Sequence, residues 1–183
     1  MQSLKKFLLA KGYIKTPLTL TKTNHFEVVA KINGITGRFI LDTGASNTCI
    51  GFDCIEHFNL ETEASEVKAA GAGATNMLTQ VSKKNTLEME SWKLKKLKIV
   101  LFDLTHVNSA LTIHDALPVH GIIGADVLKK AKAVIDYNKK TLFLKSSAEF
   151  LLYLKEGVVL ILSFMVRPFN NPLLISPSVM VPT

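Results

Sequence analysis

Apolar and polar residues alternate along several short segments of the chain, with the period of two that is typical of half-buried β-strands. The clearest segment is residues 26–32, FEVVAKI, where every second residue is apolar and Glu27 and Lys31 fall between them. The pair Asn33-Gly34 then predicts a tight hairpin turn, and residues 38–42 form the expected return strand. This part of the chain therefore predicts a β-hairpin that ends at Asp42.

The remaining pattern predicts more short strands and few helices. Going along the chain, we expect a buried strand at 47–52, about two helical turns at 53–61, two strand segments joined by a Gly/Ala-rich tip at 66–90, a long strand with room for a bulge at 91–104, a loop at 105–120, an apolar strand running into a short helix at 121–131, and a hairpin at 133–145. Such a series predicts a mostly-β barrel or sandwich, with a short helix after the Ile-Ile-Gly strand.

The two ends of the chain differ from this central region. Residues 1–23 are expected to form an N-terminal arm with a short amphipathic helix that ends at Gly12, and residues 24–146 the main domain. Residues 147–183 form a C-terminal tail that holds four of the six prolines and an apolar run, Gly157 to Val166. That run is about half the ~20 residues that a membrane span needs. Two interpretations of the tail stay open: a packed extra element or an ill-ordered segment. Membrane contact is not expected.

Charge and cysteine content exclude several classes of function. The net charge of +7 comes from lysines that alternate with apolar residues and lack interleaved aromatic residues, so nucleic-acid binding is not expected. Cys49 and Cys54 fit neither a CxxC pair nor a zinc spacing, and they imply no disulfide framework. The five histidines form no close metal-binding pair. We therefore expect a cytoplasmic protein with no metal and no cofactor.

The strongest chemical signal is the tripeptide Asp42-Thr43-Gly44 and its surroundings. Alone, Asp-Thr-Gly is a common turn sequence, in which the Asp side chain hydrogen-bonds to the backbone. Here it follows apolar residues and precedes Ala45-Ser46, a Gly/Ala-rich tip follows at residues 69–75, and GIIGADVL begins eighty residues after the tripeptide. These three features, in this order, resemble the retropepsin-like family of single-domain aspartic proteases. The resemblance covers residues 24–145, about two-thirds of the chain.

The resemblance implies a closed β-barrel with one lobe per subunit, and it implies roles for particular residues. Asp42 would be the catalytic carboxylate, Thr43 would hydrogen-bond across a molecular two-fold axis, and Gly44 would let the backbone approach the partner aspartate. The other implied residues are Ala45 and Ser46 of the active-site loop, Ile122, Ile123 and Gly124 of a ψ-shaped loop beneath it, and Ala70, Gly71, Ala72, Gly73 and Ala74 of a flap over an extended polypeptide substrate.

A single Asp-Thr-Gly per chain also implies a homodimer. Aspartic proteolysis needs one ionised carboxylate to take a proton from water and one protonated carboxyl group to donate to the scissile carbonyl. No second Asp-Thr-Gly or Asp-Ser-Gly occurs in the chain, so the second carboxylate must come from another copy. Retroviral members often carry an acidic residue at the position of Ser46 and a basic one at that of Ala125, and this supporting ion pair is absent here.

Other functions fit the sequence less well. The stretch FILDTGAS superficially resembles the phosphate-binding loop of sugar kinases, but such folds need two large domains, which 183 residues cannot hold. Ser46 lacks the surrounding G-x-S-x-G of a serine nucleophile. A non-enzymatic alternative stays open: a retropepsin-like fold kept as a dimerising, peptide-binding module without catalysis.

Overall fold

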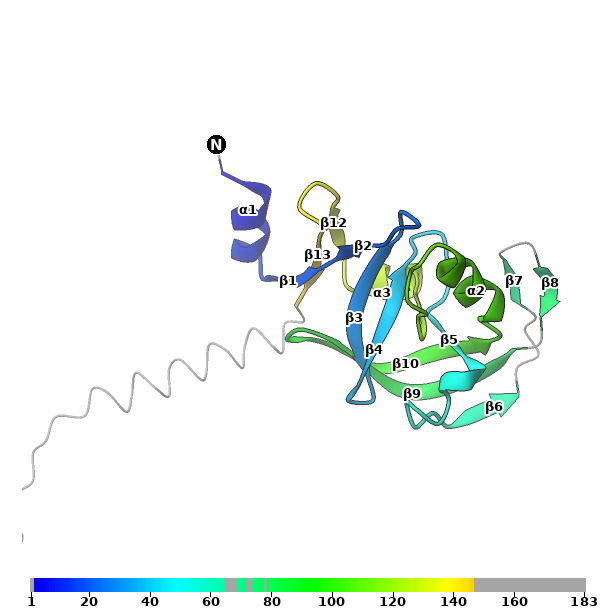
Figure 1. Ribbon diagram of the computed structural model, residues 1–183. Helices are drawn as coiled ribbons and strands as arrows, with labels where there is room; N and C mark the ends of the chain where they lie inside the picture. Colours follow the sequence, from blue (N-terminus) through cyan, green and yellow to red (C-terminus); the bar gives the residue numbers. More distant parts are fainter. Residues whose placement is uncertain (1, 65–68, 72–73, 78, 147–183) are drawn as a thin grey trace, which may run out of the picture. The chain divides into compact units, whose positions relative to one another are not determined.

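β-Strands dominate the computed structural model of the chain, which describes residues 2–64, 69–71, 74–77 and 79–146 (Figure 1). The strands are β1 (Tyr13–Pro17), β2 (Thr19–Leu20), β3 (Phe26–Ile32), β4 (Ile35–Leu41), β5 (Cys49–Gly51), β6 (Thr62–Ala64), β7 (Ala69–Gly71), β8 (Ala74–Met77), β9 (Gln80–Met89), β10 (Trp92–Phe102), β11 (Gly121–Ile123), β12 (Val134–Asp136) and β13 (Thr141–Lys145). The helices are α1 (Leu4–Ala10), α2 (Thr105–Ile113) and α3 (Ala125–Lys130), with a 3₁₀ turn at Phe52–Cys54. The predicted mostly-β fold is confirmed.

The main sheet closes on itself as a barrel. Its strand order is β2-β3-β4-β11-β5-β10-β9-β6, and β3 pairs in addition with β9 through Lys31 opposite Glu88 and Ile32 opposite Leu87. Because of this last pairing, the strands β3, β4, β11, β5, β10 and β9 form a closed ring. The closed β-barrel expected from the sequence is therefore present, with the short helix α3 directly after β11.

The β3–β4 hairpin follows the sequence pattern closely. Ile32 and Ile35 are paired across a two-residue turn, and both turn residues have positive φ, 51° at Asn33 and 86° at Gly34. Only residues that tolerate positive φ fit such a turn, which is why Asn-Gly is the preferred pair. Along β3, Val28 is buried and Lys31 exposed, as the alternation predicts.

Glu27 departs from that alternation, because it is buried although we expected it on the polar side of β3. Arg38 on β4 explains this: its Nε and a terminal guanidinium nitrogen donate to the two carboxylate oxygens of Glu27 at 2.9 and 2.8 Å. A bidentate pair of this kind satisfies both charges where water is scarce. The partner lies on a neighbouring strand, so the pattern within β3 could not reveal it.

The hydrophobic core fills the barrel. Fully buried side chains come from β4, β5, β9, β10 and β11, among them Phe39, Ile50, Leu87, Leu97 and Ile123. The long strand β10 is irregular, with register shifts against β9 between Leu94 and Leu97 and again between Leu97 and Ile99. A strand of this length bends around a barrel more easily at such bulges, and the long, bulged strand expected here is confirmed.

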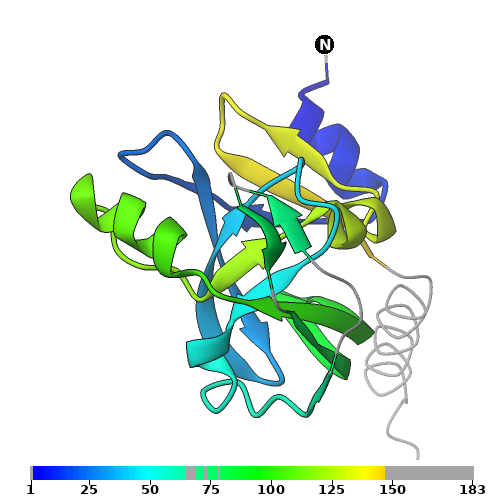
Figure 2. The same ribbon diagram turned by 90° about the vertical axis from the view of Figure 1, so that its right-hand side faces the viewer.

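Two local expectations are wrong. Residues 105–120, predicted as a loop, contain the helix α2, which Figure 2 shows projecting in green away from α1 and the β12–β13 hairpin. Residues 53–61, predicted as about two helical turns, form only the 3₁₀ turn at Phe52–Cys54 followed by turns.

A second sheet joins the two ends of the described region. Its strand order is β1-β13-β12, and the indole nitrogen of Trp92 donates to the carbonyl of Lys145 at 3.0 Å. The expected N-terminal helix is present as α1, and Gly12, with φ of 76°, follows it. Among the described residues, none of the helices has the length and apolar character needed to cross a bilayer. The expected C-terminal tail, residues 147–183, lies outside the described residues.

Candidate active site

The active-site loop expected from the sequence leaves the barrel where β4 ends. β11 lies between β4 and β5, parallel to the first and antiparallel to the second. The backbone N–H of Asp42, the first residue after β4, donates to the carbonyl of Ile123 at 3.1 Å. The loop residues 42–46 and the predicted segment Ile122 to Gly124 are thus neighbours in space, although 80 residues separate them.

Asp42 is exposed in the single chain. Its Oδ1 accepts a hydrogen bond from the backbone N–H of Gly44 at 2.7 Å, so the Asp-Thr-Gly turn holds one carboxylate oxygen in place. Thr43 and Ser46 are also exposed, and Ala45 is partly buried. The loop therefore presents an oriented carboxylate on a polar surface that is exposed among the described residues.

The other side of this loop packs tightly against the start of α3. The backbone N–H of Ala125 donates to the carbonyl of Ala45 at 2.7 Å. A Cβ atom added to Gly124 would lie 2.6 Å from the carbonyl carbon of Asn47 and 2.8 Å from the carbonyl oxygen of Ala45. Because such distances are far shorter than van der Waals contact, only glycine allows the two segments to approach this closely.

Two residues that the sequence analysis did not select complete the support of the loop. Thr48 is fully buried, and both its backbone N–H and its hydroxyl donate to Oδ1 of Asp126 at 2.8 Å. The same hydroxyl accepts a hydrogen bond from the backbone N–H of Gly124 at 3.1 Å. The sequence signal for Asp126 was its position two residues after Gly124, because a carboxylate in the first turn of a helix interacts favourably with the helix dipole.

Apolar residues line the face of the barrel on which Asp42 lies. Ile40 is two residues before Asp42, and its neighbour across the β4–β11 pairing is Ile122. Both contact a small cluster outside the main core that includes Leu111 of α2 and Val119. The unpredicted helix α2 therefore covers the apolar surface next to the loop of residues 42–46.

The segment expected to form a flap is described in part. Ala70 and Gly71 lie in β7 and Ala74 lies in β8, and the two strands form a separate antiparallel sheet with Gly71 opposite Ala74. Ala72 and Gly73 lie outside the described residues. The expected pair of strand segments on either side of a Gly/Ala-rich tip is thus present.

Two histidines stack beside the middle of β4. The rings of His57 and His120 have centroids 5.2 Å apart and an interplanar angle of 19°. Nδ1 of His120 accepts a hydrogen bond from the backbone N–H of Arg38 at 3.1 Å, which requires the neutral tautomer with its proton on Nε2. Burial and, to a lesser extent, the neighbouring His57 lower the pKa of His120.

The cysteines are unsuited to nucleophilic chemistry. Cys49 and Cys54 are buried and unpaired, and burial raises the pKa of each thiol to about 12. Since the thiolate is the reactive form, both side chains act as small apolar groups near neutral pH. Within the described part of the chain, no group of three or more His, Cys, Asp or Glu side chains is arranged to hold a metal ion.

Comparison with known proteins gives one family and several similar folds. The sequence model of the aspartyl protease family matches residues 28–127, more than half of the chain. No curated protein sequence matches this chain. Among solved structures, a retropepsin-like aspartic protease from Rickettsia conorii is 16% identical, with a TM-score of 0.49 over 74% of this chain and 91% of that one.

Two further solved structures are similar to the chain at the same level. EIAV protease complexed with the inhibitor HBY-793 is 19% identical, with a TM-score of 0.45 over 66% of this chain and 92% of the viral one. The retroviral protease-like domain of Ddi1 from Leishmania major is 14% identical, with a TM-score of 0.45 over 69% of this chain and 90% of that domain.

Proposed function

Because the chain belongs to the aspartyl protease family, we propose that it is an endopeptidase whose active site forms between two copies. Each copy contributes one Asp42 carboxylate, and the pair activates a water molecule for attack on a peptide bond. The substrate is an extended polypeptide, held in the cleft by backbone hydrogen bonds with alternate side chains in pockets. No metal or cofactor takes part.

The observation behind this proposal is the position of Asp42. It is exposed at the end of β4, one oxygen is held by the Gly44 N–H, and the loop around it is fixed from behind by Ile123, Gly124 and Ala125. The other side of the loop, which carries Asp42, Thr43 and Ser46, is exposed among the described residues. A second copy placed on that surface would bring two Asp42 carboxylates together.

The chemistry follows from having two carboxyl groups about 3 Å apart. Like charges at that distance do not both ionise, so the pair shares one proton. The ionised carboxylate takes a proton from water as the water attacks the carbonyl carbon, and the protonated carboxyl group donates to the carbonyl oxygen. The N–H of Gly44 donates to Oδ1 of Asp42 and so orients the carboxylate.

The remaining site residues have supporting roles in this proposal. Thr43 bonds across the two-fold axis, Ala45 and Ser46 line the cleft, and Ile122, Ile123 and Gly124 form the ψ-loop beneath it. The hairpin β7–β8, with residues 70–74, is the flap that closes over the substrate and excludes water. The protease domain comprises residues 24–146, preceded by an arm of residues 1–23 and followed by a tail of residues 147–183.

The decisive test is cleavage of an unstructured protein by the full-length chain and its Asp42→Asn variant. We expect cleavage that a statine-type inhibitor blocks, and a loss of at least a hundredfold in the variant, because an amide cannot take or share the proton. Glu63→Gln, an exposed site paired with Lys83, is the control and should keep full activity. A folded wild-type protein that cleaves nothing would favour the peptide-binding module without catalysis.

A further inference from the structure

A groove of about 1170 Å³ lies between α2 and the turn that begins at Phe52. Its apolar lining comes from Phe52, Leu104, Ile113 and Pro118. Its polar lining comes from the carboxylates of Asp53 and Asp103 and from the α2 side chains Thr105, His106, Asn108, Ser109 and Thr112. The groove therefore combines an apolar surface with two carboxylates, and nothing in the catalytic proposal uses it.

The two carboxylates are available to a ligand. No lysine or arginine lines the groove, and neither Asp53 nor Asp103 forms an ion pair with any residue that the structure describes. Oδ1 of Asp103 accepts hydrogen bonds from the N–H and the hydroxyl of Thr105, at 2.8 and 2.5 Å. These bonds orient the side chain and lower its pKa, while no bond found among the described residues uses Oδ2.

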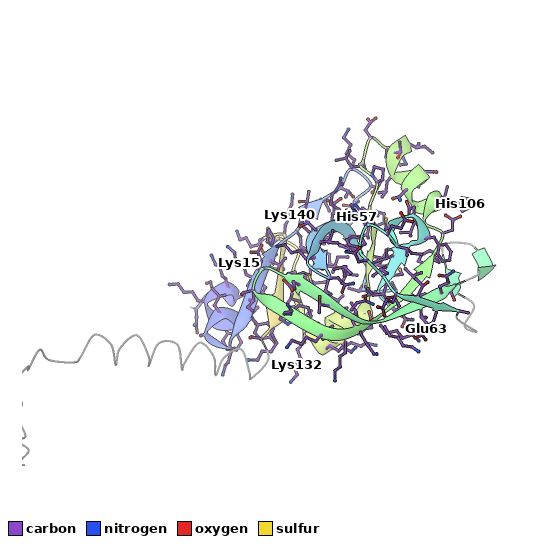
Figure 3. The ribbon with its side chains drawn as sticks, turned by 90° about the horizontal axis from the view of Figure 1, so that it is seen from below. Lys15, His57, Glu63, His106, Lys132 and Lys140 are labelled. Atoms are coloured by element: carbon purple, nitrogen blue, oxygen red, sulfur yellow. The ribbon has the colours of Figure 1, made fainter. Side chains whose placement is uncertain are left out.

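This local negative charge contrasts with the rest of the protein. The whole chain carries a net charge of +7. Figure 3 labels Lys15, Lys132 and Lys140 on the α1 side of the described unit, and His106 of α2 on the other side. A positively charged group entering the groove would therefore meet two carboxylates and no lysine or arginine among the residues that line it.

The groove is also within reach of a polypeptide bound at Asp42. The backbone N–H of Gly51, directly before the turn, donates to the carbonyl of His120, whose own N–H donates to the carbonyl of Arg38. Arg38 is four residues before Asp42, which is about 13 Å along a strand. An extended polypeptide has the same rise per residue, so a substrate side chain that reaches the groove is at least about four residues from the bond at Asp42.

We propose that this groove binds a lysine or arginine side chain of the polypeptide substrate, about four residues from the bond that is cut. This inference rests on the proposed function and adds the charge preference of its substrate. The aliphatic stem of the side chain lies on Phe52, Leu104 and Ile113, and its charged head lies between Asp53 and Asp103. Long basic side chains commonly bury their stems in this way while their charge stays near water.

The first test measures binding without catalysis. The full-length Asp42→Asn protein is titrated with three fluorescent 12-residue peptides at pH 7.5, by fluorescence anisotropy. The peptides are identical except that a residue four positions from a central Leu-Phe is Lys, Gln or Glu. We expect the Lys peptide to bind about three- to tenfold more tightly than the Gln peptide, the range of one or two partly exposed ion pairs, and the Glu peptide to bind more weakly still.

Variants then locate the preference. Asp53→Asn and Asp103→Asn, separately and together, should remove the advantage of the Lys peptide and leave the affinity for the Gln peptide unchanged. Asn at position 103 can still accept from Thr105, so the start of α2 is preserved. The matched control is Asp115→Asn, which removes an equally exposed carboxylate after α2 that is paired with Lys22 and does not line the groove.

The outcomes separate this inference from the proposed function. Equal affinity for the Lys and Gln peptides, or an equal loss in Asp115→Asn, would overturn the groove proposal even if the wild-type protein cleaves peptides. Lys-selective binding that depends on Asp53 and Asp103 would support the groove even if no cleavage is found. In an active enzyme, the same selectivity should appear in kcat/KM for the three peptides.

Discussion

The carboxylate of Asp126 accepts two hydrogen bonds from Thr48, one from its backbone N–H and one from its hydroxyl, both at 2.8 Å. Because the Thr48 hydroxyl also accepts from the N–H of Gly124, three residues from two distant segments share one network. The network lies directly behind the loop that carries Asp42. It provides a way to test whether the position of that loop controls activity.

Replacing Asp126 should separate its hydrogen-bonding role from its charge. Asp126→Ala leaves the N–H and hydroxyl of buried Thr48 without their acceptor, so unfolding should become easier by about 1–3 kcal/mol. Asp126→Asn keeps an acceptor oxygen and should retain most of the stability. Urea unfolding measures the stability, and kcat and KM are measured on the same preparations.

If the network positions Asp42, kcat should fall in Asp126→Ala more than KM changes, and Asp126→Asn should restore it. Thr48→Val removes the hydroxyl but keeps the N–H, so its kcat should lie between those of Asp126→Ala and Asp126→Asn. An Asp126→Ala protein with reduced stability and unchanged kcat would mean that the network supports only the fold.

Gly124 should be one of the least replaceable residues of the chain. A Cβ at this position would meet backbone atoms of Ala45 and Asn47 at 2.6–2.8 Å, and backbone cannot rotate away as a side chain can. Gly124→Ala should therefore destabilise the fold by about 2 kcal/mol or more, by the usual cost of overpacking. Thermal unfolding of purified protein gives the comparison.

The matched control for this variant is Gly34→Asn. Gly34 has positive φ, and nothing lies within 4 Å of an added Cβ. Asparagine tolerates such a conformation, so the loss of stability should be small. If Gly124→Ala and Gly34→Asn unfolded at the same temperature, close packing at Gly124 would not explain the loss of stability in Gly124→Ala.

The proposed dimer predicts that activity depends on protein concentration. Each chain has one Asp-Thr-Gly, so dilution below the dimer dissociation constant should lower the activity per chain. Sedimentation velocity over the same concentrations should show dimer converting to monomer in parallel. A monomer that keeps its full specific activity would rule out a shared active site.

His120 predicts a pH dependence of stability. Its pKa is lowered in the folded chain, so below about pH 6.5 the unfolded chain binds more protons at this site than the folded chain does. At pH 7.5 this difference in proton binding has no effect on stability. As the pH falls from about 6.5 toward the lowered pKa of His120 in the folded chain, it increasingly destabilises the fold. The surrounding groups are the stacked ring of His57, the cation of Arg38 and the carboxylate of Asp53.

The measurement compares urea unfolding of wild type and His120→Asn at pH 7.5 and pH 5. The Asn oxygen can accept from the Arg38 N–H in place of Nδ1, so the variant keeps the hydrogen bond and loses the titration. Wild type should lose more stability than the variant between the two pH values. Equal losses would show that His120 is protonated as easily in the folded chain as in the unfolded one.

The sequence predicted those elements whose signal is local. The alternation in residues 26–32, the Asn33-Gly34 turn and the strand-to-helix segment 121–131 were all found where expected, because hairpin turns and strand faces depend on a few adjacent residues. The family was indicated by Asp-Thr-Gly together with the Gly/Ala-rich tip and the GIIGADVL segment, in that order. That Asp42 lies beside Ile123 was expected only from the resemblance, since neither segment indicates the other by itself.

α2 shows where local signals were overridden. Thr, Val, Asn and Ser are weak helix formers, so residues 105–113 looked like a loop. The helix is stabilised by tertiary contacts: Asn108 bonds both backbone groups of Val119, and Leu111 packs near Ile40. The spacing of Leu104 and Leu111 was compatible with a helix, but seven residues with intervening polar groups were too few to decide.

The sequence by itself determined the strands of the β3–β4 hairpin, its tight turn and the candidate catalytic carboxylate, because each is specified by neighbouring residues. The tertiary structure alone decided that Glu27 is buried against Arg38, that Thr48 is held by Asp126, and that Asp53 and Asp103 line one groove. In each of these cases the two side chains are between 11 and 78 residues apart. The β3–β4 hairpin brings Glu27 and Arg38 together, and contacts between distant segments bring the other two pairs together. The pattern within one segment does not record which polar residues of other segments it will meet.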